Sequence, residues 1–414
     1  MKLSLRQQLT QFGHLLQDDL FPILEEACGE MDDTTRRLVA TLEMLPLGRF
    51  IPSGSGWVGR PARDRYAIAR AFVAKAVYGM SVTRDLIQRL RNDEQLRKLC
   101  GWNKVSQIPS ESKFSRVFAE FAEMELAQFV HEALILDTQK DRLIGHISRD
   151  STAIEVRERF AEEGPKTISK SKQKADEERM RARQLPLVGA SDETKPQPKK
   201  KRGPKGPHGR HKRYKGGKRK YQPNPQSRLH RQRGMKLPAM LEELPKHCSI
   251  GVKTSNDGHQ KNWRGYKFHV DVADGQIPIS AVVTAASLHD SQVAIPLATM
   301  TAQRVTNLYD VMDAAYDANE ILDHSRSLGH VPLVKAVRRV GKRDGSEELQ
   351  PTRSFSPAEE ERFRERTTVE RVNARLKDEF GVREIRVRGH RKVAAHLMFA
   401  VLALTADQIL KLAM

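Results

Sequence analysis

A charged stretch at positions 363–380, FRERTTVERVNARLKDEF, holds residue types that could perform chemistry. It contains four Arg, one Lys and four carboxylates among only a few apolar residues. At about 100° per residue, one narrow stripe of a helix here would hold Phe363, Arg366, Glu370 and Lys377. The neighbouring stripe is apolar and must face the core, through Val369, Val372, Leu376 and Phe380. Flanking cations keep a Glu at the edge of a buried face ionised and hold its side chain in one direction.

A structural interpretation of Glu370 is also open. Arg366 and Glu370 stand four residues apart, the spacing of ion pairs that decorate exposed helices for about 0.3–0.5 kcal/mol. This spacing alone favours an ion pair, so the surrounding elements have to decide what Glu370 does.

The helix that carries the stripe has clear predicted ends. Ser356 and Glu359 form a capping box, and Pro357 takes the first helical position. Gly381 ends the helix. These signals predict one helix of about 24 residues.

Strands should lie upstream of that helix. Residues 142–156 read as a strand that carries Asp150, and 263–287 as a hairpin whose second strand lies deeper. Residues 307–317 then predict a strand with Asp313, followed by a helix over 318–329. Pro332 removes a ladder donor from the next strand, which should therefore be an edge. The pattern predicts an α/β mixed sheet with flanking helices.

Residues 1–140 are expected to form an all-α N-terminal domain. Apolar residues recur at helical spacing after Arg65, and Ser110 is a plausible N-cap for the helix that follows it. Residues 81–121 could include a helix-turn-helix. The apolar run 393–412 contains His396, Thr405 and Asp407, so we expect a buried helix there and no membrane span.

Composition restricts the class of partner. The chain carries 72 Lys and Arg against 52 Asp and Glu, for a net charge of +20. A protein this basic usually binds a polyanion, either nucleic acid or an anionic membrane. Three widely spaced Cys residues give neither a disulfide framework nor a zinc site. The N-terminus does not look like a signal peptide, which predicts a cytoplasmic protein.

Much of the charge lies in one segment. Residues 195–241 contain no Asp or Glu, and such a basic, Gly- and Pro-rich composition cannot fold alone. We therefore expect a basic, disordered insertion at 159–250, between the first strand of the sheet domain in 141–158 and the remainder of that domain in 251–414. Its densest cations are candidates for DNA phosphate binding: Lys199, Lys200, Lys201, Arg202, Lys212, Arg213, Lys218, Arg219 and Lys220.

The stripe on the long helix resembles a known signature. Phe363, Arg366, Glu370 and Lys377 resemble the Y-(2)-R-(3)-E-(6)-K pattern of DDE transposases from bacterial insertion sequences, with Phe in place of Tyr. SRDSTAIE, at 148–155, looks like the first aspartate motif of that group, and VMDAAYDANEI, at 311–321, looks like the second. Residues 59–102 resemble its helical N-terminal domain.

The resemblance implies a ribonuclease-H-like catalytic domain with the triad Asp150, Asp313 and Glu370. It implies two Mg²⁺ ions, with Mn²⁺ able to replace them, which suit carboxylate oxygens and phosphodiester cleavage. Asp150 would bridge the ions. Phe363, Arg366 and Lys377 would then lie beside the DNA, although Phe363 lacks the hydroxyl of the usual Tyr.

Other residues compete for these roles. Glu155 is a less direct candidate on the first strand, and Asp317 is expected to cap a helix. His289 and Asp290 look catalytic, but a helix start explains them better. Trp263 and Tyr266 could stack on a flipped base, although core packing is the simpler expectation.

The leading prediction is a transposase that binds the terminal inverted repeats of its own insertion sequence, cuts, and joins the ends to target DNA. We expect a homodimer on DNA and association with the nucleoid. The alternative is a catalytically inactive, transposase-derived DNA-binding protein. A basic RNA-binding protein is disfavoured because the sequence has no RRM or KH motif.

Overall fold

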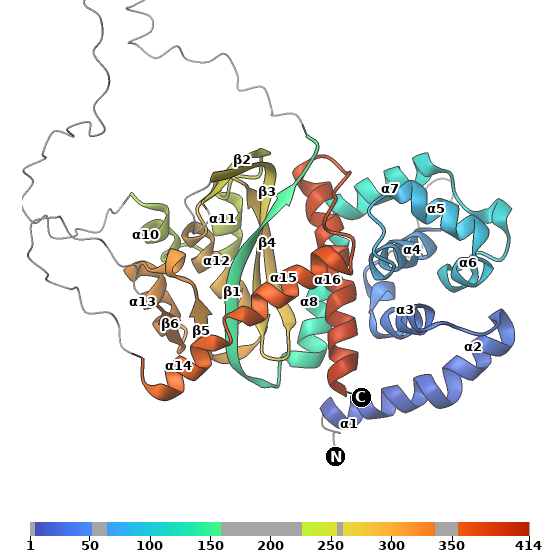
Figure 1. Cartoon of the computed structure of the whole chain (residues 1–414), viewed down its shortest axis with the longest axis horizontal. Helices are drawn as coiled ribbons and strands as arrows, with labels where there is room; N and C mark the ends of the chain where they lie inside the picture. The colour runs from blue at the N-terminus through green and yellow to red at the C-terminus, as the bar shows by residue number, and fades with distance from the viewer. Residues whose placement is uncertain (1–4, 52–63, 159–225, 255–259, 336–354, 414) are drawn as a thin grey trace, which may run out of the picture. The chain divides into compact units, whose positions relative to one another are not determined.

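The computed structural model describes residues 5–51, 64–158, 226–254, 260–335 and 355–413 (Figure 1). The nine candidate cations between Lys199 and Lys220 lie outside this part of the chain. Everything below concerns the described residues.

The N-terminal region is helical, as predicted. Its helices are α1 (Leu5–His14), α2 (Phe21–Cys28), α3 (Asp33–Met44), α4 (Arg65–Val77), α5 (Thr83–Asn92), α6 (Glu94–Cys100), α7 (Glu111–Glu123) and α8 (Leu126–Gln139), with short turns η1 (Leu15–Leu20), η2 (Leu47–Arg49) and η3 (Val105–Gln107). The Ser110 side chain accepts a hydrogen bond from the Lys113 backbone N–H and caps α7, which confirms the predicted start.

The C-terminal region is built on a mixed sheet. Its strands are β1 (Leu143–Glu155), β2 (Ser249–Thr254), β3 (Gln260–Ala273), β4 (Ile277–Ala285), β5 (Thr306–Met312) and β6 (Val331–Val334). The described strands have the order β2-β3-β1-β5-β6, with β4 also paired to β3. β1, β5 and β6 run parallel, whereas β3 is antiparallel to its three neighbours. β6 is outermost, so the edge predicted from Pro332 is confirmed.

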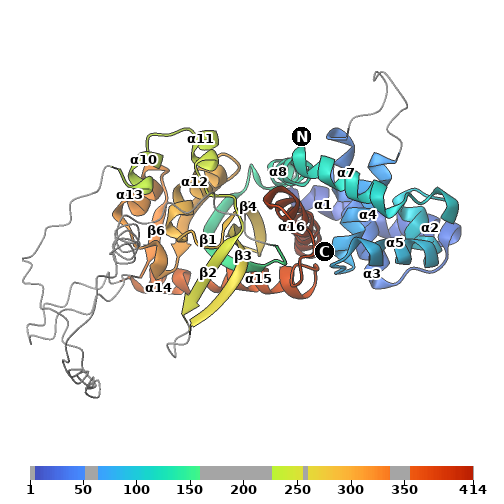
Figure 2. The same ribbon diagram turned by 90° about the horizontal axis from the view of Figure 1, so that it is seen from above.

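Helices cover both faces of the sheet, as Figure 2 shows from above. α12 (Ser291–Ala302) packs on β3 and β4, and α15 (Thr367–Asp378) packs on β1 and β3 from the other side. Three further helices surround the sheet: α13 (Asn319–Ser327), α14 (Pro357–Arg364) and α16 (His390–Ala413). This arrangement confirms a mixed sheet with flanking helices.

We expected the second strand of the hairpin to be buried more deeply than the first, and the structure does not show this difference. From Tyr266 onward β3 is nearly as buried as β4, because helices cover both of its faces. His269 is fully buried and its Nε2 lies 2.9 Å from the Thr284 hydroxyl. The Asp271 carboxylate is also fully buried and pairs with the Arg149 guanidinium, at 2.7 Å. β3 is thus a central strand with polar groups paired inside the protein.

The predicted helix of about 24 residues is two helices. α14 ends at Arg364 and α15 begins at Thr367, with a turn at Glu365 and Arg366. The Ser148 hydroxyl on β1 donates to the Glu365 carbonyl at 2.9 Å, and the Thr367 hydroxyl donates to the Arg364 carbonyl. Hydroxyls that bond helix carbonyls bend or interrupt a helix, which accounts for the break.

The predicted basic insertion ends earlier than residue 250. Within it, α10 (Arg228–Gln232) and α11 (Leu237–Glu242) are helical, and β2 begins at Ser249. Met240 is buried against Ile295 and Met312, and Leu244 against Leu297. These buried apolar side chains form a core that the charge pattern of the sequence did not predict.

α16 joins the N-terminal helices to the sheet. It contacts α3, α4, α7 and α8 on one side and β4 on the other, and both views show it between the two regions. Among the described residues, His390–Leu412 is the one segment long and apolar enough to cross a membrane, and its most apolar part is buried inside the protein. This confirms the predicted buried helix.

Candidate active site

Asp150 lies in the middle of β1, opposite Val270 of β3. Burial raises the pKa of its carboxyl to about 7, although the Ser151 N–H donates a hydrogen bond to it. Nearby carboxylates add to this rise, namely Asp313, Asp290 and Glu370. They come from separate elements, so the fold brings distant acidic residues around Asp150.

Asp313 follows directly after β5, the parallel neighbour of β1. Its carboxylate accepts a hydrogen bond from the Ala315 N–H at 2.9 Å and caps the turn η4 (Ala314–Tyr316). Burial raises the pKa of Asp313, and the charge of Asp290 raises it further, while Arg366 opposes the change. The turn thus fixes a partly desolvated carboxylate beside β1.

Glu370 lies on the first turn of α15 and shows both features that the sequence left open. Its carboxylate is 2.6 Å from the Arg366 guanidinium, so the predicted ion pair is present. Its charge also acts on the buried Asp150 carboxyl. With a side chain 48% exposed, Glu370 occupies the solvent side of the acidic cluster.

The other residues of the charged stripe have different surroundings. Lys377 donates to the Thr152 hydroxyl of β1, and burial together with the nearby cations Lys253 and Arg383 lowers its pKa. Phe363 lies on α14, beyond the helix break, where its ring contacts Phe355 and the Lys335 ammonium. The predicted apolar stripe is confirmed, with Val369, Val372, Leu376 and Phe380 buried.

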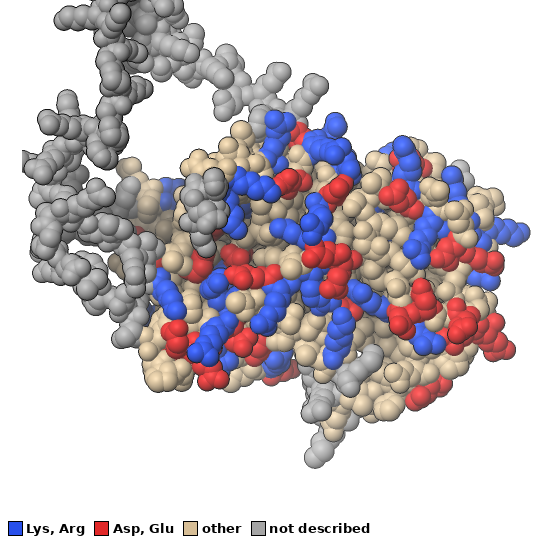
Figure 3. Space-filling model, in the orientation of Figure 1, with Lys and Arg blue, Asp and Glu red and all other residues tan. Residues whose placement is uncertain are grey.

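The face that carries α14 and α15 has no uniform charge. Figure 3 shows Lys and Arg intermixed with Asp and Glu along it. Besides the Arg366–Glu370 pair, Arg375 on α15 bonds both Glu379 and Asp407. Several cations on this helix are therefore already paired with carboxylates.

The helix start predicted at Asp290 is confirmed, whereas the partner of its carboxylate was not predicted. Asp290 occupies the N-cap position of α12, as expected for a helix start, but its side chain makes no capping bond. The carboxylate instead accepts a hydrogen bond from Lys267 Nζ at 2.9 Å. The spacing between Asp290 and Asp313 in the sequence did not predict this contact, because Lys267 reaches α12 only through the fold of β3 and β4.

The remaining candidates lie in other surroundings. Asp317 does not take the N-cap position of α13, which is held by Ala318. Glu155 pairs with Lys261 on the surface, at 3.4 Å. Trp263 and Tyr266 are buried, as the core interpretation predicted, and the Tyr266 hydroxyl donates to Glu158.

A buried polar layer lies beside the acidic cluster. The Arg149 guanidinium makes two hydrogen bonds to the Asp271 carboxylate, which also accepts from the Thr301 hydroxyl at 2.7 Å. Tyr316 of η4 is 1% exposed, and its hydroxyl has no hydrogen-bond partner. Burial and the charges of Asp290 and Asp150 raise the pKa of that phenol. A buried hydroxyl without a partner marks a place for a water molecule or ligand.

The carboxylates around Asp150 are donors that suit a hard cation, although in this structure they do not yet lie close enough together to hold one. Within the described ranges, no three His, Cys, Asp or Glu residues already stand close enough to hold a metal ion. Carboxylate oxygens are nevertheless the donors that Mg²⁺ prefers, and a divalent cation would offset both the burial of Asp150 and the repulsion from its neighbouring carboxylates, which raise its pKa. The residues therefore fit such an ion in chemistry and charge.

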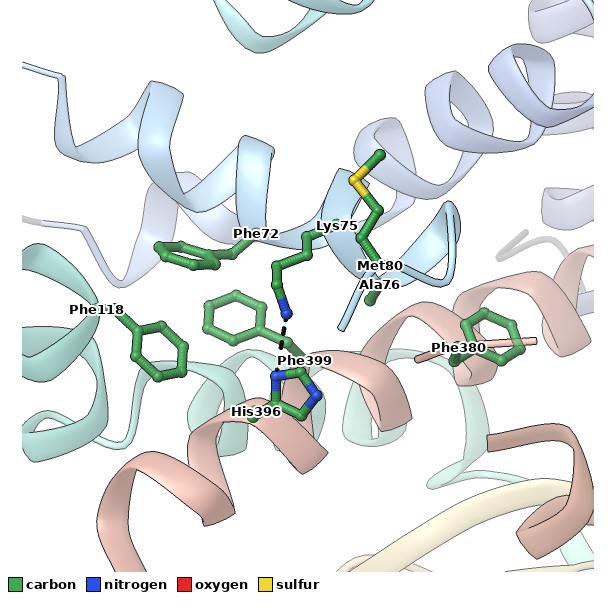
Figure 4. A pocket seen from close by; sticks show the side chains of 8 residues that line it. All are labelled: Phe72, Lys75, Ala76, Met80, Phe118, Phe380, His396 and Phe399. Atoms are coloured by element: carbon green, nitrogen blue, oxygen red, sulfur yellow. Dashed lines mark hydrogen bonds between the residues drawn. The ribbon is translucent and has the colours of Figure 1, made fainter. Parts of the chain in front are cut away.

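A second buried charged group lies where α4 meets α16, in the small pocket of Figure 4. Lys75 Nζ donates to the Ser81 carbonyl at 3.0 Å and lies 3.3 Å from His396 Nδ1. The rings of Phe72, Phe118, Phe380 and Phe399 line the rest of the pocket. Burial lowers the pKa of Lys75 to about 7 and that of His396 to about 3.

Comparison with protein families specifies the class of protein to which this sheet and its acidic residues belong. Residues 242–406 match the family described as Transposase DDE domain, and residues 26–120 match Transposase domain (DUF772). The chain belongs to the DDE transposases of insertion sequences. Asp313 and Glu370 lie within the first match, whereas Asp150 lies between the two. Neither the curated proteins nor the solved structures gave a match.

Proposed function

We propose that this transposase cuts the terminal inverted repeats of its own element and joins the 3′ ends to target DNA, using Asp150, Asp313 and Glu370. The observation that carries the proposal is positional: Asp150 lies on the central strand β1, Asp313 directly follows its parallel neighbour β5, and Asp313 and Glu370 both lie within the matched Transposase DDE domain. Carboxylates that crowd one buried position are a frequent sign of an active site.

The strand arrangement supports a ribonuclease-H-like catalytic domain. β1 lies between an antiparallel hairpin and two parallel strands, with Asp150 on the central strand and Asp313 after its parallel neighbour. α15 crosses the same part of the sheet and contributes Glu370. The Arg366, Glu370 and Lys377 spacing further supports the YREK-signature group.

The three carboxylates would divide the task of holding two Mg²⁺ ions, or Mn²⁺ in their place. When bound, the ions supply activation of the attacking water or 3′-hydroxyl and stabilisation of the leaving oxygen. Asp150, the most buried of the three, would contact both ions, and Asp313 and Glu370 one each. Because Arg366 holds Glu370 in the described structure, that ion pair has to loosen for Glu370 to take this role.

DNA would supply the competing partner for Arg366. A phosphate beside α15 could accept from the Arg366 guanidinium and leave Glu370 free, while Lys377 binds a second phosphate. Phe363 would add a contact beside them. The cations between Lys199 and Lys220 would add sequence-independent affinity. Pairing two element ends calls for a homodimer on DNA, at the nucleoid of a bacterial cell.

Replacing Glu370 by Gln tests the assignment. We expect Mg²⁺-dependent nicking of end DNA to fall by about 10³-fold or more, because the site loses one of its few anionic ligands. Folding and end binding should persist, since the ion pair that is lost is half exposed.

Glu359→Gln is the matched control for that experiment. Glu359 belongs to the capping box of α14, where it accepts from the Ser356 N–H at 2.8 Å. Because Gln also completes a capping box, its replacement should change stability only slightly and leave nicking unchanged. A Glu370→Gln protein that nicks at the wild-type rate would reduce Glu370 to a surface ion-pair residue.

A further inference from the structure

We infer that Asp290 and Lys267 form a charge-setting pair for the acidic cluster, in which Asp290 is a fourth carboxylate that helps the cluster hold a cation and Lys267 is its internal counter-ion. The inference rests on the proposed function and extends it to two residues outside the triad. Both act as positioning residues, through charge.

The pair is well built for this role. Lys267 Nζ bonds the Asp290 carboxylate at 2.9 Å and the Leu288 carbonyl at 2.8 Å. The two side chains are only 14% and 23% exposed, so solvent screens their charges weakly. Asp290 occupies an N-cap position without capping the helix, which shows that its carboxylate is directed to other groups.

Asp290 is also a common neighbour of the groups that define the site. It is among the charges that act on Asp150, on Asp313 and on the Tyr316 hydroxyl. The Tyr316 hydroxyl is a separate observation: it is buried, has no hydrogen-bond partner within the described part of the chain, and lies within reach of the charges of Asp290 and Asp150. A surface ion pair would have neither feature.

The sheet register explains why Asp290 would not replace a triad member. Successive strand residues point to opposite faces, so Ser151 and Asp150 diverge. Ser151 bonds Asp290 and faces α12, whereas Thr152, on the Asp150 side, bonds Lys377 of α15. Asp290 therefore reaches the cluster from behind β1, where a carboxylate changes the potential at the proposed metal ligands.

Two conservative variants separate this role from that of a structural ion pair. Asp290→Asn keeps the size and removes the negative charge, and Lys267→Gln can still donate to the Leu288 carbonyl. If the pair only stabilises the fold, both variants weaken the site in the same direction. If it sets the charge of the cluster, they act in opposite directions.

The measurement is Mn²⁺ binding to the full chain without DNA, followed by electron paramagnetic resonance, with a melting curve for each variant. We expect Asp290→Asn to weaken binding by about 10-fold or more, the range found for groups that orient metal ligands. We expect Lys267→Gln to tighten it by roughly threefold or more, because a cation is removed from beside the site. Partial unfolding cannot produce tighter binding.

Controls keep this inference apart from the proposed function. Asp150→Asn should abolish the same Mn²⁺ binding, and its failure to do so would refute the proposed triad. Glu120→Gln breaks a comparable ion pair with Arg65, at 2.7 Å in the N-terminal helices, and should leave Mn²⁺ binding unchanged. The charge-setting role is refuted if Asp150→Asn abolishes binding but Asp290→Asn and Lys267→Gln shift it in the same direction, or each by less than twofold.

Discussion

Asp150 and Lys75 are both buried ionisable residues with a pKa of about 7, reached from opposite directions. At Lys75 the cause is burial among aromatic rings, and the ammonium donates to a carbonyl and lies beside a neutral imidazole. At Asp150 burial acts together with three further carboxylates from separate elements. The shifted pKa alone therefore does not identify a site, whereas like charges gathered around a buried position give it a reason to bind a cation.

DNA cutting should separate the two positions most strongly. Asp150→Asn removes the carboxylate that is proposed to contact both metal ions, so nicking of end DNA should fall by about 10³-fold or more. Lys75→Met removes a cation far from the acidic cluster and should change nicking by less than about threefold. End-DNA binding, measured in parallel, should remain in both. If Lys75→Met also abolished nicking in a folded protein, the contrast between the two positions would be lost.

Asp150 and Lys75 should contribute to the pH dependence of stability with opposite signs. The Asp150 pKa rises on folding from about 4, so its stabilising contribution is complete below pH 4 and is lost as the pH rises to about 7. The Lys75 pKa falls on folding from about 10.5, so its contribution is complete above that pH and is lost as the pH falls to about 7. Each amounts to roughly 4–5 kcal/mol at most.

The metal-free protein should consequently have a stability minimum near pH 7 from these two groups. Urea unfolding between pH 4 and 10 measures it. Asp150→Asn should flatten the acidic side of the minimum, and Lys75→Met the alkaline side. An Asp150→Asn protein that keeps the full acidic slope would show that other groups cause it.

Substitutions at two glycines test the packing around Lys75, and their expected effect is smaller. Gly381 and Gly389 both have positive φ, at +72° and +87°. A Cβ at Gly381 would meet the Gly79 backbone at 2.9 Å, whereas a Cβ at Gly389 would have open space. Gly381→Ala should cost about 3 kcal/mol and Gly389→Ala about 1 kcal/mol of unfolding free energy.

The Gly381 carbonyl also accepts from His396, which lies beside Lys75. Chemical denaturation should therefore show the larger loss at Gly381, with nicking per folded molecule retained. Equal losses at the two glycines would mean that the backbone contact between Gly79 and Gly381 yields easily.

Local sequence signals predicted the elements that carry the site. A short β-prone run placed Asp150 on a strand, Pro332 marked an edge, and helical spacing separated the apolar face of α15 from its charged one. Each of these signals depends on residues near one another in the chain, where period and propensity are informative.

Features that depend on distant partners could not be predicted in this way. The break between α14 and α15 involves the Ser148 hydroxyl, 217 residues away from Glu365. Lys267 on β3 holds the Asp290 carboxylate away from the start of its helix, α12. The ion pair of Glu370 was visible from its spacing, but its electrostatic contact with Asp150 required the fold.

The position of α16 has a consequence for biosynthesis. A single apolar core includes Leu38 of α3, Phe72 of α4, Phe118 of α7 and Leu404 of α16. Because translation delivers α16 after the entire sheet, the N-terminal helices emerge from the ribosome without the helix that completes their core. A truncated translation product that stops before α16 would leave apolar surface exposed and be open to proteolysis.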